Sequence, residues 1–291
     1  MFSLTSVQKE QFKEDGFIIC DEIIKEKDVE LLLNRFEAIF DGEYETGLDP
    51  DEVNWKKSRD SESLTRQICN GWKSDRYVAS VILRSEIGRA CAYLGDWPGA
   101  RLTQDNLLWK PPGGRPIGFH QDSSYEEFIV PNEWVSCWIA LDDTSSLGGT
   151  VEYVKGSHLW EKTGKIRQFH GPKDPHENLR RAASQAGLDN FDTVKIEVPA
   201  GGGTFHSGWI WHGSDVNKRD IPRRSIVAHC MSSEATFHPN PLTTNRTYSR
   251  FKRFGDQHMD ETHFPILWRE DGYASPFIAP YSAHQLGWAE G

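Results

Sequence analysis

Short segments rich in β-forming residues, separated by clusters of Pro and Gly, fill the chain from about residue 97 to residue 230. No helical pattern alternates with them, apart from one insert at about residues 155–192. A parallel sheet needs such alternating helices, because its crossover connections are usually helical. The pattern therefore predicts an antiparallel sandwich or barrel. The predicted strands cover residues 101–109, 117–121, 134–141, 150–154, 194–198, 203–207 and 224–230.

Helical patterns precede this β-rich region. Thr5 or Ser6 can cap a first helix. Ser85 can cap a later helix that ends at Leu94, with Gly95 in the C-terminal capping position. Between them, apolar residues recur at three- and four-residue steps, as on the buried face of a helix. The helices are expected at about residues 6–14, 28–40 and 85–94, with a strand at 17–20, and we expect them to pack outside the β core.

The remaining segments carry turn residues and little periodicity. Residues 41–66 are acidic and turn-rich, and the insert contains a helix-like region at 175–186. From about residue 238 onward, Pro, Asn, Thr and aromatic residues follow no period, which indicates an irregular tail. We therefore predict one domain over residues 1–291, with a helical part at about 1–96, a β core at about 100–235 and a tail at 236–291.

The charge of the chain narrows the possible partners. Forty-three acidic residues oppose 33 basic ones, which gives a formal net charge of -10. Such a chain repels phosphate backbones and anionic lipids, so we expect neither a nucleic-acid partner nor a membrane partner. No apolar run approaches the roughly 18 residues of a membrane-spanning helix. The five scattered cysteines form no C-x-x-C pair, and we expect them as buried thiols in a cytoplasmic protein.

One group of residues suggests a metal site. His120 and Asp122 lie two positions apart in a predicted strand, so both side chains leave the same face and can meet one ion. The second imidazole is expected from His212, which follows a triple-glycine turn, with His206 as the rival for this role. Two histidines and a carboxylate form the facial triad of non-haem Fe(II) oxygenases and leave three metal positions open. Three open positions suit one bidentate oxoacid and dioxygen.

An arginine follows the second histidine at a distance of eleven residues. Arg223 opens a predicted strand, and burying its charge is costly unless a partner neutralises it. A bound dicarboxylate would be such a partner, because the planar guanidinium matches a carboxylate with two hydrogen bonds. Strand alternation separates Arg223 from Arg224, and we place Arg223 inside the core and Arg224 outside.

Several further motifs occur in a fixed order. They are Leu4-Thr5 leading to Phe12-x-x-Asp15-Gly16-Phe17, then His120-Gln121-Asp122, Trp138-Ile139-Ala140-Leu141, Gly156-Ser157-His158, and His212-Gly213-Ser214 with Asn217 and Arg223. Together they resemble the phytanoyl-CoA hydroxylase (phytanoyl-CoA dioxygenase) family of Fe(II)/2-oxoglutarate oxygenases over about residues 4–230. One departure is Lys155, which stands where the family often has Pro.

The resemblance implies a double-stranded β-helix, the cupin-like jelly roll, as the core. It implies that His120, Asp122 and His212 bind Fe(II), with O₂ and 2-oxoglutarate as the other reactants. Related halogenases replace the carboxylate ligand by a small residue. The retained Asp122 therefore favours hydroxylation, desaturation or cyclisation over chlorination.

Other residues are expected around the cosubstrate. The resemblance implies that Arg223 binds the distal carboxylate of 2-oxoglutarate, that Ser214 assists it, and that Trp138 lines the pocket. Gln104 and Asn106 share one face of the strand at 101–109. If this face points inward, they can bind cosubstrate or substrate; otherwise neighbouring backbone groups satisfy them.

Two histidines are expected to play no part in this site. His158 and His229 are predicted to be ordinary hydrogen-bonded histidines near the core. The unassigned segments 41–66, 155–192 and the tail after residue 238 are expected around the mouth of the jelly roll, where they would close over the metal. Their mixture of Glu, Lys, Arg and Trp favours a polar small molecule over a long acyl chain.

We therefore predict an Fe(II)/2-oxoglutarate-dependent dioxygenase that oxidises a small organic molecule and releases succinate and carbon dioxide. One alternative is a catalytically silent jelly roll that binds a ligand, which should lack part of the metal or arginine set. A second alternative is a cupin-type isomerase or hydrolase that uses the metal without 2-oxoglutarate. The pair Arg223 and Ser214 argues against this second alternative.

Overall fold

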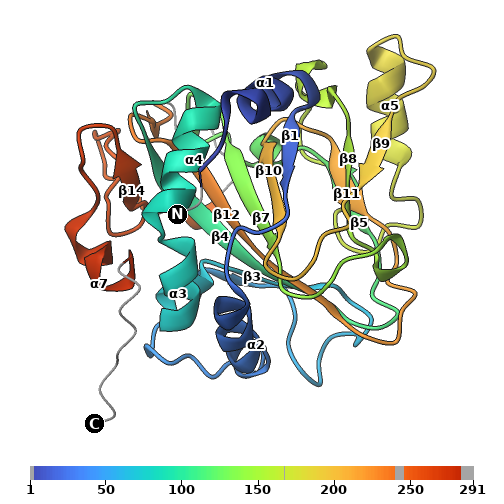
Figure 1. Ribbon diagram of the computed structural model, residues 1–291, viewed down its shortest axis with the longest axis horizontal. Coiled ribbons are helices and arrows are strands. Elements are labelled where there is room, and N and C mark those ends of the chain that lie inside the picture. Colours follow the sequence, from blue (N-terminus) through green and yellow to red (C-terminus); the bar gives the residue numbers. More distant parts are fainter. Residues whose placement is uncertain (1–2, 167, 240–245, 283–291) are drawn as a thin grey trace.

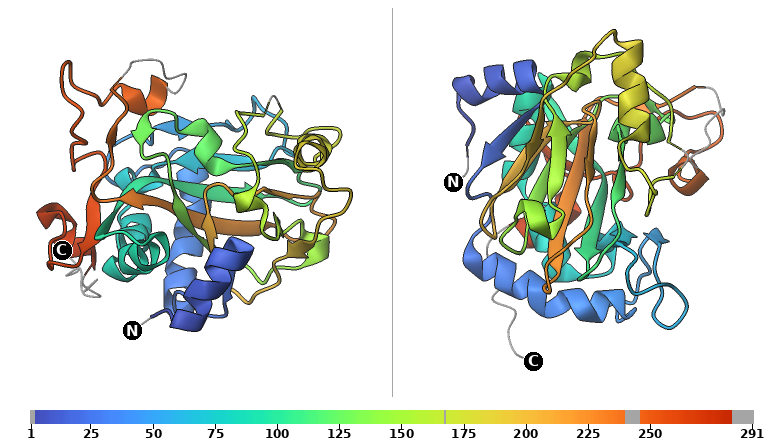
Figure 2. Two further views of the ribbon diagram at one scale, coloured as in Figure 1. Left: turned by 90° about the horizontal axis from the view of Figure 1, so that it is seen from above. Right: turned by 90° about the vertical axis from the view of Figure 1, so that its right-hand side faces the viewer.

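The structure is a computed structural model that describes residues 3–166, 168–239 and 246–282. Two antiparallel sheets face each other in it (Figures 1 and 2). The larger sheet has the order β1-β10-β7-β12-β4-β3-β2, with β14 added beside β4. Its strands are β1 Phe17–Cys20, β2 Glu52–Val53, β3 Arg66–Cys69, β4 Gly99–Lys110, β7 Val135–Ala140, β10 Gly203–Ser207, β12 Arg223–Ser232 and β14 Ile266–Arg269.

The smaller sheet has the order β5-β11-β8-β9. Its strands are β5 Ile117–His120, β8 Val151–Val154, β9 Thr193–Lys195 and β11 His212–Ser214. From β4 onward the chain passes back and forth between the two sheets, so that β4, β7, β10 and β12 lie opposite β5, β8, β9 and β11. This winding is the double-stranded β-helix, and the predicted jelly-roll fold is confirmed.

Helices cover the outer face of the larger sheet (Figure 1). They are α1 Ser6–Asp15, α2 Glu26–Phe40, α3 Arg76–Ile82 and α4 Ser85–Gly95. Apolar side chains of α2 at three- and four-residue steps, such as Leu32 and Phe36, pack in one core with Cys137 and Ile226 of the sheet. The outer face of the sheet is therefore apolar, and the inner face is left for the site.

Local signals in the sequence explain the first helix. Thr5 caps α1, and its hydroxyl accepts from the backbone N–H of Gln8 at 3.2 Å. Gly16 ends the helix with a φ of 83°, in the left-handed region that favours glycine. Strand β1 begins at the next residue, as predicted.

The caps of α4 differ from the prediction by one residue. Arg84 is the N-cap without a side-chain cap hydrogen bond, and Ser85 is already helical. The Arg84 guanidinium instead pairs with Asp28 of α2. Gly95 is the last helical residue, and Asp96 takes the left-handed position. A Cβ on Gly95 would lie 2.4 Å from the Trp97 ring, so packing is the reason for glycine there.

Some elements were not predicted or lie elsewhere. Helix α3 and strands β3 and β11 are additions, and Asp75 caps α3 by accepting from two backbone N–H groups. Strand β9 covers Thr193–Lys195, whereas the prediction was 194–198. The ladder ends early because the Val198 N–H donates to the Thr144 hydroxyl at 2.8 Å. The predicted helix in the insert is confirmed as α5, Glu177–Gln185.

The tail is more regular than predicted. Strand β14 pairs with β4, and β13 (Thr236–Phe237) pairs with β6 (Ile129–Val130). Buried Arg101 of β4 donates to the Met259 carbonyl at 3.1 Å, which ties the tail to the core. The described parts of the tail, residues 236–239 and 246–282, therefore pack on the core, and a single domain over residues 1–291 stays a prediction.

Two further expectations can be compared with the structure. All five cysteines are buried and free, which confirms the prediction of buried thiols. Among the described residues, no helix has both the length and the apolar character that crossing a bilayer requires.

Candidate metal and cosubstrate site

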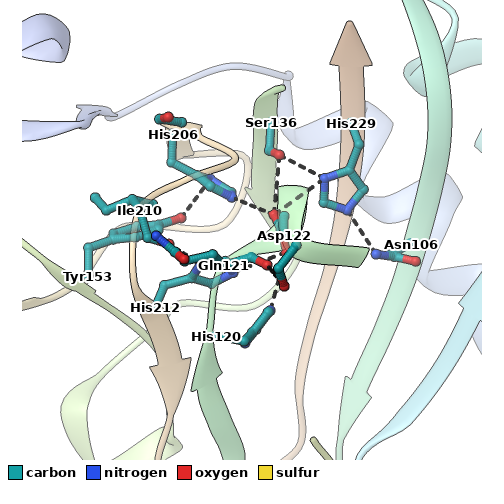
Figure 3. A network of polar contacts seen from close by, with 12 residues as sticks. Asn106, His120, Gln121, Asp122, Ser136, Tyr153, His206, Ile210, His212 and His229 are labelled. Carbon is teal, nitrogen blue, oxygen red and sulfur yellow. Dashed lines mark hydrogen bonds and ion pairs between the residues drawn. The ribbon is translucent and has the colours of Figure 1, made fainter. Parts of the chain in front are cut away.

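Three predicted ligands meet where the two strands β5 and β11 pair (Figure 3). His120 ends β5, His212 begins β11, and the two residues are direct cross-strand partners. The prediction placed Asp122 in the same strand as His120, which is wrong: Asp122 opens a 3-10 helix, η2 Asp122–Tyr125. The extended backbone of Gln121, with φ -118° and ψ 123°, still brings the side chains on either side of it together.

The geometry defines one possible ion position. One ligand atom from each of His120, Asp122 and His212 lies within 4.8 Å of the other two. Asp122 Oδ1 is 3.2 Å from His120 Nε2 and 3.5 Å from His212 Nε2. All three residues are buried or nearly so, which is typical of a protected metal site.

Hydrogen bonds to the backbone assign the tautomers of the two imidazoles. His120 Nδ1 lies 2.9 Å from the Gly118 carbonyl, and His212 Nδ1 lies 3.1 Å from the Ile210 carbonyl. A carbonyl only accepts, so each Nδ1 carries the hydrogen and each Nε2 presents a lone pair. This arrangement is the usual support for a histidine metal ligand.

The site suits a cation. With both rings neutral, two imidazole lone pairs and a carboxylate oxygen face one another, and a positive ion between them would stabilise this arrangement. Burial lowers the pKa of His212 to about 3, so this ring is neutral at pH 7. Burial opposes ionisation of Asp122, but the surrounding histidines hold the pKa of its carboxyl well below the usual value. The donor set of two nitrogens and one oxygen fits Fe(II).

His206 lies on the other side of the carboxylate. Its Nε2 is 3.3 Å from Asp122 Oδ2, and its Nδ1 is 2.9 Å from the Tyr153 hydroxyl. Nδ1 can accept from the Tyr153 hydroxyl, and the hydrogen of the ring is then on Nε2 and points at Asp122. No lone pair of His206 is then directed at the ion position. The arrangement favours His212 over His206 as the ligand.

The larger sheet carries the predicted cosubstrate arginine. Arg223 is 5% exposed and lies inside, whereas Arg224 faces outward and pairs with Asp142, so the predicted orientation is confirmed. Two guanidinium nitrogens of Arg223 donate to Ser225 Oγ and to the Gly149 carbonyl, each at 3.1 Å. Its Nε has no hydrogen-bond partner among the described residues. A buried cation with a free donor fits a carboxylate of a bound molecule.

Lys110 is a residue that the sequence analysis missed. It pairs directly with Arg223 across β4 and β12, and it is fully buried. Its ammonium donates to Ser214 Oγ at 2.7 Å and to the Asp215 carbonyl. The predicted assistant Ser214 is therefore held by a second cation. Only the register of the two strands could have indicated this, because Lys110 carries no motif of its own.

Two neighbouring cavities connect these groups. The inner one is lined by the three candidate ligands together with Trp138, Ser214, Arg223 and Asn106. The outer one has a volume of about 510 Å³ and shares His120, Asp122 and Asn106 with it. Gln104 lines the outer cavity, so the face of β4 that carries Gln104 and Asn106 points inward.

All three unassigned segments reach the outer cavity. Residues 41–66 contribute Glu52 and Asn54, the insert contributes Lys165 and Phe169, and the tail contributes Tyr248. The segments expected around the mouth therefore do lie there. His158 is remote from this cavity and binds the Lys13 carbonyl, as an ordinary hydrogen-bonded histidine would. His229 is not remote: its Nδ1 lies 3.6 Å from Asp122 Oδ2.

Known proteins share this sequence pattern and this fold. The family model for phytanoyl-CoA dioxygenase (PhyH) matches residues 12–225. A probable alpha-ketoglutarate-dependent hypophosphite dioxygenase of Stutzerimonas stutzeri is 23% identical over 233 residues, which cover 78% of this chain and 79% of that protein. The human peroxisomal phytanoyl-CoA dioxygenase is 23% identical over 253 residues, which cover 80% of this chain and 70% of the human protein.

A solved structure extends the comparison to three dimensions. The epimerase SnoN, crystallised with Fe3+, alpha ketoglutarate and nogalamycin RO, superposes with a TM-score of 0.66 at 20% identity. The match covers 90% of this chain and 98% of SnoN, and it shows a common fold. Together with the family match, the relatives confirm the predicted class of enzyme, a dioxygenase that depends on iron and 2-oxoglutarate. The chain belongs to the phytanoyl-CoA dioxygenase family.

Proposed function

We propose that this protein oxidises a small polar molecule, with Fe(II) bound by His120, Asp122 and His212 and with 2-oxoglutarate held by Arg223. One observation carries the proposal: the three ligands and the partly unpaired guanidinium of Arg223 line the same inner cavity. Bound iron would supply activation of O₂ coupled to the conversion of 2-oxoglutarate into succinate and carbon dioxide. Neither a silent binding protein nor a cupin isomerase would need a buried arginine beside a complete metal triad.

Residues of this chain would bind the cosubstrate, exclude water and contact the substrate. Arg223 would bind the distal carboxylate of the cosubstrate, and Ser214 would donate its hydrogen to the same group, since Lys110 already donates to Ser214. Trp138 is 3% exposed and would keep water away from the cosubstrate. Gln104 and Asn106 would present their amides to the substrate in the outer cavity.

The outer cavity supports a polar substrate. Three carboxylates, Glu52, Glu126 and the candidate ligand Asp122, and one ammonium, Lys165, stand in its wall along with several amides. A CoA thioester carries several negative phosphates and a long apolar chain. An excess of carboxylates in the cavity wall repels the phosphates. The amides in the wall would lose hydrogen bonds to water beside the apolar chain. A compact substrate with hydroxyl or amino groups fits this wall and a volume of about 510 Å³.

The location of the protein stays a prediction. Five free buried thiols and an acidic chain are consistent with the reducing cytoplasm. Fractionation of cells that express the native chain would test it.

The reaction can be tested without knowing the substrate. The iron-loaded protein is incubated with 2-oxoglutarate and O₂, and succinate is measured with and without members of a library of small polar compounds. We expect slow succinate formation alone and faster formation with a true substrate. The variants H212A and R223A are the controls, and equal succinate from them and from the unmodified protein would refute the proposal.

A further inference from the structure

The two oxygens of Asp122 have different neighbours (Figure 3). Oδ1 faces the Nε2 atoms of the two candidate histidine ligands. Oδ2 faces His206 Nε2 at 3.3 Å, Ser136 Oγ at 3.4 Å and His229 Nδ1 at 3.6 Å. The neighbours of Oδ2 can all donate a hydrogen. The carboxylate is therefore oriented from its second oxygen, on the side away from the ion position.

One of these neighbours belongs to a longer chain of hydrogen bonds. Gln67 Nε2 donates to Asn106 Oδ1 at 3.2 Å, which turns the Asn106 nitrogen toward His229. Asn106 Nδ2 then donates to His229 Nε2 at 2.8 Å. His229 must carry its hydrogen on Nδ1, which lies 2.7 Å from Ser136 Oγ. The hydroxyl hydrogen of Ser136 is left for Asp122 Oδ2.

This series of hydrogen bonds crosses three neighbouring strands of the larger sheet. Asn106 lies on β4, His229 on β12 and Ser136 on β7, and these three strands are neighbours. His229 and Ser136 are direct cross-strand partners. Their exposed fractions are 3% and 0%, and the Trp134 ring lies 4.9 Å from the His229 ring. Buried side chains on paired strands have little room to rotate. The hydrogen direction of each bond in this series therefore fixes the direction of the next bond.

The other end of the chain lies in the wall of the outer cavity. Gln67 and Asn106 both line that cavity, and Asn106 also lines the inner one. A substrate that binds either amide therefore contacts the chain directly. Asp122, at the far end, is the candidate carboxylate ligand.

We propose that His229 is a positioning residue that holds the second oxygen of Asp122 through Ser136, and that Asn106 connects this hold to the substrate cavity. The proposal rests on the proposed function, since Asp122 must be a metal ligand. With Oδ2 engaged, only Oδ1 is directed at the ion, which keeps a further metal position free for cosubstrate or O₂. Groups behind a metal ligand commonly change metal affinity by about 10–100-fold when they are removed.

The order of donors and acceptors in this series of hydrogen bonds gives a specific test. In N106D the new carboxylate only accepts, so His229 must carry its hydrogen on Nε2 and accept at Nδ1. Ser136 then donates to His229, and Asp122 Oδ2 loses that hydrogen bond. S136A removes the same bond at its last step. N54D is the matched control, because it makes the same change from amide to carboxylate in the wall of the outer cavity, and its side-chain amide bonds to the Thr65 carbonyl and to His170, outside this series of hydrogen bonds.

Metal affinity is the first readout. Fe(II) and redox-inert Mn(II) are titrated into each metal-free protein without cosubstrate, and thermal melting checks that each variant is folded. We expect N106D and S136A each to weaken binding by about 10-fold or more, and N54D to weaken it far less. The double variant N106D/S136A should be no weaker than the worse single variant, because both changes break one chain.

Two results would overturn the proposal. The first is an unchanged metal affinity in folded S136A, and the second is a loss in the double variant equal to the product of the single losses. These outcomes differ from a failure of the proposed function. Suppose that the unmodified protein bound metal, that N106D and S136A weakened this binding as expected, and that no succinate formed. The dioxygenase reaction would then be wrong, and the positioning role of His229 would stand.

Discussion

Lys110 and Arg223 lie directly opposite each other on β4 and β12, and both cationic side chains are buried. Among the described residues, neither forms an ion pair with a carboxylate within 4.0 Å, whereas the adjacent Arg224 pairs with Asp142. Burial lowers the pKa of Arg223 to about 10. Burial and the charge of Arg223 also lower the pKa of Lys110 well below its usual value. An anionic ligand at this end of the inner cavity would pair with Arg223 and favour the charged form of Lys110.

Replacing Arg223 by Ala should weaken 2-oxoglutarate binding by about 10–100-fold, because a charged hydrogen bond contributes about 1.5–3 kcal/mol. Metal affinity should change little. Calorimetric titration of the Mn(II)-loaded protein with 2-oxoglutarate measures the first affinity, and titration of the metal-free protein with Mn(II) measures the second. R224M is the control, since its side chain is on the outer face of the same strand. Equal affinity for 2-oxoglutarate in R223A and the unmodified protein would contradict the assignment.

The two histidines beside Asp122 should respond differently to substitution. H212A removes a candidate ligand and should abolish stoichiometric Fe(II) binding at micromolar metal. H206Q removes a ring that contacts Oδ2 and the Tyr153 hydroxyl but no candidate ligand, so it should retain binding with about 10-fold lower affinity. Metal titration followed by elemental analysis separates the two variants. The opposite ranking would make His206 the ligand.

Buried Asp105 should give the protein a distinct pH dependence. Burial raises the pKa of this carboxyl to about 7, although its oxygens accept from the Gly71 and Trp72 backbone N–H groups. Between about pH 4 and 7 the folded protein holds a proton that the unfolded chain releases. The free energy of unfolding contributed by this group therefore falls as the pH rises through that window.

The variant D105N isolates this contribution. Its amide does not titrate, so the stability of the unmodified protein relative to D105N should fall between pH 5 and pH 8. Urea unfolding of the metal-free proteins at both pH values measures the difference. Parallel pH profiles for the two proteins would show that Asp105 is not responsible.

Two glycines with similar φ angles allow the cost of backbone strain to be measured apart from the cost of a steric clash. Gly16 has φ 83° and Gly42 has φ 88°. A Cβ at Gly16 would lie 2.5 Å from His158 Nδ1, whereas at Gly42 it would meet nothing within 4 Å. G42A should cost about 1–2 kcal/mol from backbone strain alone, and G16A should cost more. Chemical unfolding compares them, and equal losses would mean that His158 moves away without penalty.

The segments at the cavity mouth should become protected when substrate binds. Residues 41–66 and 155–192 line the outer cavity, and closing them would exclude water from the metal. Limited proteolysis with mass spectrometry follows cleavage in both segments. Protection should need metal, 2-oxoglutarate and substrate together. Cleavage that no substrate of the succinate assay slows would contradict a closing role.

The sequence by itself determined the features that depend on local chemistry. Capping residues and apolar steps predicted α1 and α2, since a helix end needs hydrogen-bond partners and a helix face needs burial. Strand alternation also predicted that Arg223 and Arg224 lie on opposite faces of their strand. Short β segments without helices between them predicted antiparallel sheets, because nothing could connect parallel strands.

Only the tertiary structure decided which side chains meet. The three-residue strand β11 has no periodicity of its own and exists because β5 and β8 supply its hydrogen bonds. Lys110 faces Arg223, and His229 faces Ser136, through the register of paired strands that are far apart in sequence. The packing of one sheet on the other brings the Tyr153 hydroxyl of β8 to His206 of β10. Composition and spacing cannot encode this, because hydrogen-bond direction depends on atoms that meet only after the sheets have formed.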